Sequence, residues 1–103
     1  MRDEAAVFAA LGDDTRLGLM ARLGEEGPSS IARLTLGGAM TRQAVTKHLY
    51  VLEKAGLVTC ARLGRESLWQ VECRRMEEAR KFLDLMSRRW DERIERLRAY
   101  VEG

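Results

Sequence analysis

The C-terminal part of this 103-residue chain constrains the fold most strongly, because residues 75–101 contain neither glycine nor proline. Such a stretch is typical of one uninterrupted helix, about 40 Å long at about 1.5 Å per residue. A helix of this length is longer than is needed to cover the hydrophobic core of the rest of the chain. Its apolar residues recur at steps of 4, 3, 4, 4, 3 and 4, along one face: Ala79, Leu83, Met86, Trp90, Ile94, Leu97 and Val101. An apolar face of this length needs a partner chain, and a twofold-symmetric homodimer is the commonest solution. We therefore expect Leu83 and the residues that follow it on this face, namely Met86, Trp90, Ile94, Leu97 and Val101, to form a dimer interface.

The length of the chain supports a single domain, spanning residues 1–103, with a thin hydrophobic core. Its two cysteines, Cys60 and Cys73, and its single histidine, His48, are scattered and form no C-x-x-C motif. A structural zinc site usually takes four nitrogen or sulfur ligands, so we expect no metal and no cofactor. No phosphate-binding loop and no paired nucleophile and base are recognisable, which argues against an enzyme.

No apolar segment approaches the roughly 20 residues that a membrane span needs; the longest covers residues 5–11. The N-terminal region is acidic and lacks the layout of a signal peptide. We therefore expect a cytoplasmic protein with no membrane partner.

Two helices are predicted in the first quarter of the chain. One runs over about residues 3–11 and ends at Gly12; Asp13 then has the side chain and the position of an N-cap for a helix over residues 14–23. Gly24 and the Gly27-Pro28 pair are expected to break this second helix. Its apolar face is predicted to carry Leu17, Met20 and Leu23.

A helix-turn-helix is predicted at about residues 30–55. Ser29 or Ser30 can cap a short helix that stops at Gly37-Gly38, and Thr41 can cap the next helix, which ends at Gly56. The second helix has one apolar face, formed by Val45, Leu49 and Leu52. Two short helices joined by a glycine-containing turn, the second with one apolar face that can be buried, are typical of this motif.

A β-hairpin, here called the wing, is predicted at about residues 57–73, where two β-prone runs flank Gly64-Arg65. With a two-residue turn, Leu63 pairs with Glu66 and Cys60 pairs with Trp69. Cys60 and Cys73 are then about 13 Å apart along the ladder, beyond disulfide reach, so both thiols should be free. The fold class is therefore mainly α with a small β-hairpin: four helices, a two-stranded wing and a fifth helix, in a dimeric winged helix-turn-helix.

Charge is distributed unevenly along the chain, although the net charge is only +2. Residues 1–30 carry three bases and six acids, a net −3, and residues 76–103 carry seven of each. Residues 31–75 carry eight bases and three acids, a net +5. The basic surplus thus coincides with the helix-turn-helix and the wing, which indicates a polyanionic partner.

The outward face of the predicted second helix of the motif, residues 41–55, carries the side chains that read double-stranded DNA. At 100° per residue, Gln43, Lys47 and Tyr50 point away from the apolar face, and Arg42 lies in the first turn. Arginine can pair with guanine and glutamine with adenine, whereas lysine and threonine suit phosphate oxygens. His48 lies at the edge of the apolar face and is either a packing residue or a phosphate ligand. The predicted DNA-binding residues are Thr41, Arg42, Gln43, Thr46, Lys47, His48 and Tyr50, with Arg62 and Arg65 at the wing tip.

The chain resembles the ArsR family of bacterial winged-helix repressors over almost its whole length. The matching segments are residues 8–17, where Asp14 replaces the usual proline of an Asp-Pro-Thr-Arg segment, residues 44–49 and 51–58, the wing residues 64–66 and the tail residues 89–91. The match is greatest to short members often encoded beside START-like proteins. The resemblance implies a homodimer that binds a palindromic operator and represses transcription. Because the family's dimer is built on the first and last helices, it also implies that Phe8 belongs to the dimer interface.

The residues do not fit the metal-sensing members of that family. Residues 30–36 contain no cysteine and the last helix contains no histidine, so only hard oxygen ligands such as Asp84, Asp91 and Glu95 remain there. We therefore predict a regulator without the family's metal site; the sequence identifies no small-molecule effector. Two alternatives stay open: a winged-helix protein-interaction module that does not bind DNA, and a metal-responsive repressor with an unrecognised site.

Overall fold

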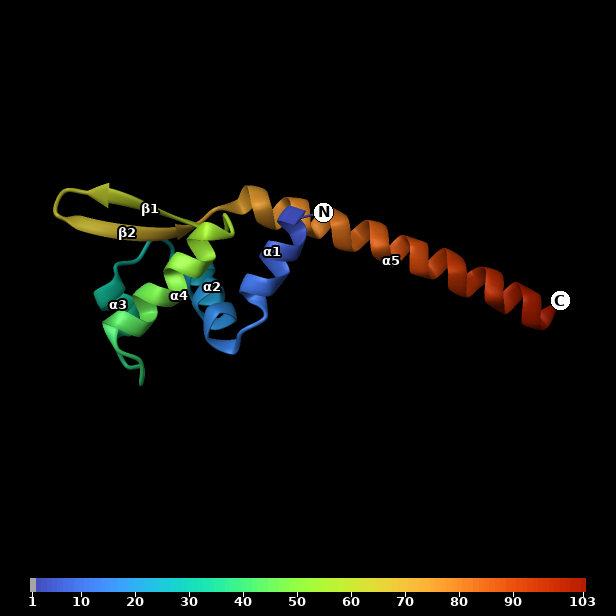
Figure 1. Ribbon diagram of the computed structural model, residues 1–103, viewed down its shortest axis with the longest axis horizontal. Coiled ribbons are helices and arrows are strands. Elements are labelled where there is room, and N and C mark those ends of the chain that lie inside the picture. The colour runs from blue at the N-terminus through green and yellow to red at the C-terminus, as the bar shows by residue number, and fades with distance from the viewer. Residues whose placement is uncertain (1) are drawn as a thin grey trace.

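The computed structural model describes residues 2–103, with side chains from Glu4 onward. Helices α1 to α4 and a two-stranded hairpin form one compact body, and a long helix projects from it to the C-terminus (Figure 1). This order confirms the predicted succession of four helices, hairpin and fifth helix. The elements are α1 (Arg2–Leu11), α2 (Asp14–Glu26), α3 (Ile31–Thr35), α4 (Arg42–Lys54), β1 (Val58–Leu63), β2 (Glu66–Val71) and α5 (Cys73–Glu102).

Three helices of the compact body begin at the predicted capping residues. The Asp13 carboxylate accepts a hydrogen bond from the Arg16 amide at 3.0 Å and caps α2. Ser30, not Ser29, caps α3, and the Thr41 hydroxyl accepts from the Ala44 amide at 3.1 Å and caps α4. Each cap satisfies a backbone donor that the first helical turn leaves without a partner.

Two predicted helix boundaries and one predicted core residue were wrong. Helix α2 continues through Gly24 to Glu26 and stops only at Gly27, which has a φ of 80°; an isolated glycine weakens a helix without ending it. Helix α5 begins at Cys73 rather than at residue 75, so Cys73 does not belong to the wing. Leu17 is 53% exposed, and α2 contributes Leu19, Met20 and Leu23 to the core instead.

The wing has the predicted register. Leu63 pairs with Glu66 across the Gly64-Arg65 turn, and Cys60 pairs with Trp69. Cys60 and Cys73 are both free and exposed. Ser29 adds a short antiparallel bridge to Trp69, so the segment between α2 and α3 lies along the outer edge of β2. This bridge joins the wing to the helix-turn-helix.

The hydrophobic core lies under the inner face of α4. Val45, Leu49 and Leu52 are buried there, as the spacing predicted, and the latter two are fully inaccessible. The core is completed by residues from every element of the compact body and from the start of α5: Val7, Ala10, Leu19, Met20, Leu23, Leu34, Leu57, Val58, Trp69 and Ala79. This packing fixes the outer face of α4 relative to the wing.

Only the first part of α5 contacts the rest of the chain. Ala79 is buried, and the Phe82 ring lies 6.2 Å from that of Phe8, so Phe8 packs first within its own chain. From Leu83 onward every residue is exposed. Among the described residues, no helix is both long and apolar enough to cross a membrane.

Candidate nucleic-acid interface

The outer face of α4 presents two cationic side chains and one amide to solvent. Arg42, Gln43 and Lys47 are exposed, and none of them forms an ion pair or hydrogen bond through its side chain within the described part of the chain. Their functional groups therefore remain available to a ligand. Guanidinium and amide groups can make paired hydrogen bonds to base edges, and the ammonium group can neutralise a phosphate.

Two threonines predicted as phosphate contacts already have partners within α4. The Thr41 hydroxyl accepts the Ala44 amide as the helix cap, which leaves its own proton free to donate. The Thr46 hydroxyl donates to the Arg42 carbonyl at 2.7 Å and is half-buried. In this rotamer, Thr46 has no proton left for a phosphate oxygen.

His48 is half-buried rather than exposed with the outer face. It lies within electrostatic range of Asp13, at the corner between α1 and α2. The hydrogen bond from the Arg16 amide lowers the pKa of the Asp13 carboxyl, and the nearby charges of Arg16 and His48 lower it further. His48 therefore lies on the side of α4 that faces the corner between α1 and α2.

Tyr50 is 57% exposed, but its ring does not stand alone on the surface. It meets the Trp69 ring of β2 edge-on, with centroids 5.9 Å apart and an interplanar angle of 62°. Edge-to-face contact at this distance is favourable between aromatic rings. Tyr50 therefore has a structural contact with the wing in addition to an exposed portion.

The wing tip carries two exposed arginines at the end of the molecule opposite the C-terminus (Figure 1). Arg62 donates weakly through Nε to the Gly64 carbonyl at 3.5 Å, and Arg65 has no partner in the described chain. The wing, α3 and α4 lie at the same end, so the basic residues of the hairpin and of α4 share one end of the molecule. Arginines in such positions can enter a minor groove or contact phosphates.

The corner that supports α4 is stabilised by Arg16. Its Nε donates to the Ala10 carbonyl at 2.6 Å, and its Nη2 to the Ala9 carbonyl at 3.4 Å. These carbonyls belong to the last turn of α1, where helices leave acceptors unsatisfied. Asp13 and Arg16 thus hold the start of α2 and the end of α1 together, which gives this segment of the family motif a structural role.

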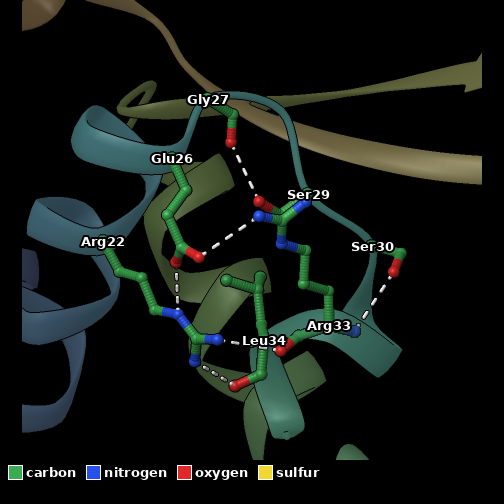
Figure 2. A network of polar contacts seen from close by, with 7 residues as sticks. All are labelled: Arg22, Glu26, Gly27, Ser29, Ser30, Arg33 and Leu34. Carbon is green, nitrogen blue, oxygen red and sulfur yellow. Dashed lines mark hydrogen bonds and ion pairs between the residues drawn. The ribbon is translucent and has the colours of Figure 1, made fainter.

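A second arginine fixes the helix-turn-helix, and sequence reasoning did not find it. Arg22 of α2 donates through Nη1 to the Leu34 carbonyl at 2.9 Å and through Nη2 to the Arg33 carbonyl at 3.0 Å, at the C-terminal end of α3 (Figure 2). Its Nε is hydrogen-bonded to the Glu26 carboxylate, which also meets Arg33 at 3.5 Å. The hydrogen bond from Arg22 lowers the pKa of Glu26, as does the charge of Arg33.

Replacing Arg22 by methionine is expected to reduce the free energy of unfolding by about 1–3 kcal/mol, because two carbonyls lose a charged donor. The matched variant Arg33→Met removes a more exposed side chain with one long contact, and should cost less than about 0.5 kcal/mol. Urea denaturation checks both. Because folding depresses the pKa of Glu26, the part of the Arg22 contribution that comes from the Glu26 contact should be complete at neutral pH and fall as the pH drops through that lowered pKa. The part that comes from the two carbonyls should remain. Equal losses for both variants would contradict this role of Arg22.

The exposed half of α5 carries the remaining predicted interface residues. Leu83, Met86, Trp90, Ile94, Leu97 and Val101 are between 42% and 74% exposed and follow one face of the helix. Within residues 2–103, no group of three or more histidine, cysteine or acidic side chains is arranged to hold a metal ion.

Comparison with known proteins places this architecture among transcriptional regulators. No family model matches the chain. It is 44% identical over 66 residues to the HTH-type transcriptional regulator YuzN of Bacillus subtilis, covering 58% of this chain and 72% of that protein. It is 29% identical over 80 residues to the HTH-type regulator MJ1325 of Methanocaldococcus jannaschii, covering 78% and 90% of the two chains.

A solved structure extends the similarity along the whole fold. The ArsR-like transcriptional regulator from Rhodococcus sp. RHA1 superposes with a TM-score of 0.83 at 31% identity, over 93% of this chain and 90% of that one. Both the helices and the wing are therefore shared with that regulator. This chain belongs to the ArsR family of winged helix-turn-helix, DNA-binding transcription regulators.

Proposed function

We propose that the chain is a homodimeric repressor that binds a palindromic operator through α4 and the wing. The observation that carries this proposal is the division of the molecule into two ends. One end presents Arg42, Gln43 and Lys47 with the wing arginines, and the other presents an uncovered apolar face on α5. Two copies joined through α5 would present two basic ends to one duplex, which matches a site with twofold symmetry.

Within this proposal, each residue has a definite role. Arg42 and Gln43 contact base edges in the major groove, and Lys47 contacts a phosphate. Thr41, which keeps its hydroxyl proton, and the wing residues Arg62 and Arg65 contact the backbone or the adjacent minor groove. Thr46 and His48 support the helix from its half-buried side, and the Tyr50 hydroxyl reaches the duplex edge.

A gel-shift titration against the DNA upstream of the chain's own gene tests the function. A specific, salt-dependent shift of that DNA over a random duplex supports a regulator that binds an operator. Salt-dependent binding without preference would contradict operator recognition, and a dimer without any DNA binding would favour the interaction module. Repeating the titration with Zn²⁺ and with reductant tests the metal-responsive alternative. That the chain is of the type encoded beside START-like proteins remains a prediction.

Replacing Arg42 by alanine is expected to lower affinity for the specific site by about 1–3 kcal/mol and to relax the sequence preference at one position of each half-site. The reason is that a guanidinium paired with guanine discriminates among bases, whereas a phosphate contact does not. Fluorescence anisotropy with operator and single-base variants measures the effect. Equal losses on specific and random DNA would reject the base contact.

Replacing Lys47 by alanine is expected to weaken binding to specific and random DNA by similar factors. The plot of log affinity against log salt concentration should become shallower by about 1, because one fewer counterion is released. The matched variant Glu53→Ala lies on the same helix but removes an acid, so it should not make the plot shallower. A changed sequence preference in Lys47→Ala would contradict a phosphate contact.

A further inference from the structure

Trp69 occupies an unusual place in the wing. Of the twelve strand residues, only Val58 and Trp69 are buried. Val58 lies at the base of the hairpin, close to the end of α4, whereas Trp69 lies midway along β2, opposite Cys60. A projecting hairpin held only at its base could pivot, so the second anchor at Trp69 determines its direction.

Three elements of the DNA-binding end meet at Trp69. Its backbone exchanges two hydrogen bonds with Ser29, from the Ser29 amide at 2.9 Å and to the Ser29 carbonyl at 2.8 Å. Its ring meets Tyr50 of α4 edge-on at 5.9 Å. Ser29 is itself buried, and its hydroxyl donates to the Gly27 carbonyl at 2.9 Å. Trp69 therefore joins the wing to the segment before α3 and to α4.

The contact with α4 depends on ring packing and not on a side-chain hydrogen bond. Trp69 is 3% exposed, and its Nε1 has no acceptor among the described residues. A buried donor without a partner is unfavourable for the stability of a fold. The indole is kept in place by packing, in the hydrophobic core and against the ring of Tyr50. Tyr50 in turn lies on the face of α4 assigned to DNA.

We propose that Trp69 and Tyr50 are positioning residues that hold the wing at the angle at which Arg62 and Arg65 reach the duplex bound by α4. This inference rests on the proposed function. It implies that Tyr50 affects DNA binding through the wing tip, which lies four residues from Trp69, about 13 Å along β2. Substitutions that far apart usually have additive effects on free energy, so non-additivity is the signature of positioning.

The test is a double-mutant cycle between Tyr50→Leu and Arg65→Ala, with DNA affinity as the readout. Leucine retains apolar bulk but removes the aromatic edge. In the parent chain, Arg65→Ala should weaken operator binding about tenfold, as expected for one phosphate or minor-groove contact. In the Tyr50→Leu background, the same change should weaken binding about twofold or less, because the wing tip is no longer held at the duplex.

Two controls separate positioning from other roles. Tyr50→Phe removes only the hydroxyl, so Arg65→Ala should keep its full effect in that background, whatever the hydroxyl contributes. Lys47→Ala lies on the same face of α4 but leaves the Tyr50–Trp69 ring contact in place, and should be additive with Arg65→Ala. Thermal unfolding shows whether Tyr50→Leu folds. If it does not, Trp69→Phe takes its place in the cycle, because the smaller phenyl ring reduces the contact with Tyr50.

The outcomes distinguish this inference from the function on which it rests. If the parent chain shows no specific DNA binding, the proposed function fails. If the parent binds its operator and Tyr50→Leu is additive with Arg65→Ala, the positioning role is overturned and repression stands. The ring contact itself is measured in the Trp90→Phe variant, where Trp69 is the only tryptophan. Its emission should then shift when Tyr50→Leu is added to that variant, and an unchanged spectrum would also count against the pair.

Discussion

Replacing Ile94 by glutamate is expected to yield a monomer that binds the operator about 100 to 10,000 times more weakly than the parent chain. Ile94 is 47% exposed in the middle of the uncovered face of α5, where a second copy would bury it. A carboxylate without a partner at such a position is costly to desolvate. A dimer that occupies one half-site holds its second subunit at a high effective concentration near the other half-site, which raises affinity by a factor of this size. A monomer lacks this gain in affinity.

Leu85→Glu is the matched control for this prediction. Leu85 is 43% exposed on the same helix and receives the same substitution, but it lies about 140° around the helix from Trp90. It should remain dimeric and retain DNA affinity. Light scattering after gel filtration and anisotropy with labelled operator measure both properties. Two monomeric variants, or two dimeric ones, would show that the predicted face is not the interface.

Replacing Leu49 by alanine is expected to lower the free energy of unfolding by about 2–5 kcal/mol, the range for a buried leucine that leaves a cavity. Leu49 is fully inaccessible on the inner face of α4. Lys47, two residues earlier on the outer face, should change stability by less than about 0.5 kcal/mol when replaced by alanine. One helix would thus separate the residues that stabilise the fold from those proposed to bind DNA.

Guanidinium denaturation at one fixed chain concentration measures these changes, since the stability of the proposed dimer would depend on concentration. Leu49→Met conserves volume and should cost less than about 1.5 kcal/mol. After correction for the folded fraction, Leu49→Ala should bind DNA nearly as well as the parent. A small loss of stability together with a large loss of DNA affinity would contradict the separation of the two faces.

Features that depend on local sequence could be predicted well. The caps at Asp13 and Thr41, the buried Val45, Leu49 and Leu52, and the wing register all follow from short-range rules for capping, periodicity and turns. Gly24 misled the prediction because a single glycine costs about 1 kcal/mol within a helix, which packing of α2 can offset.

Features that depend on the tertiary arrangement could not be predicted. Arg22 bonds to carbonyls eleven and twelve residues away, which nothing in the sequence between them specifies. The outward angle of Tyr50 was compatible with a DNA contact, but its packing on Trp69 needed the position of β2. The basic end of the molecule was thus predictable as a set of residues, whereas its internal supports were not.

The free half of α5 links folding to the amount of protein present. Residues from Leu83 onward have no contact that buries them within their own chain, and most of the stability of a helix in a protein comes from the packing of its apolar face. In the proposed dimer, each copy would therefore complete the fold of the other. Because two chains would meet on one operator, occupancy at low abundance would rise with the square of the chain concentration. A modest change in synthesis or degradation would then switch repression, with no ligand needed.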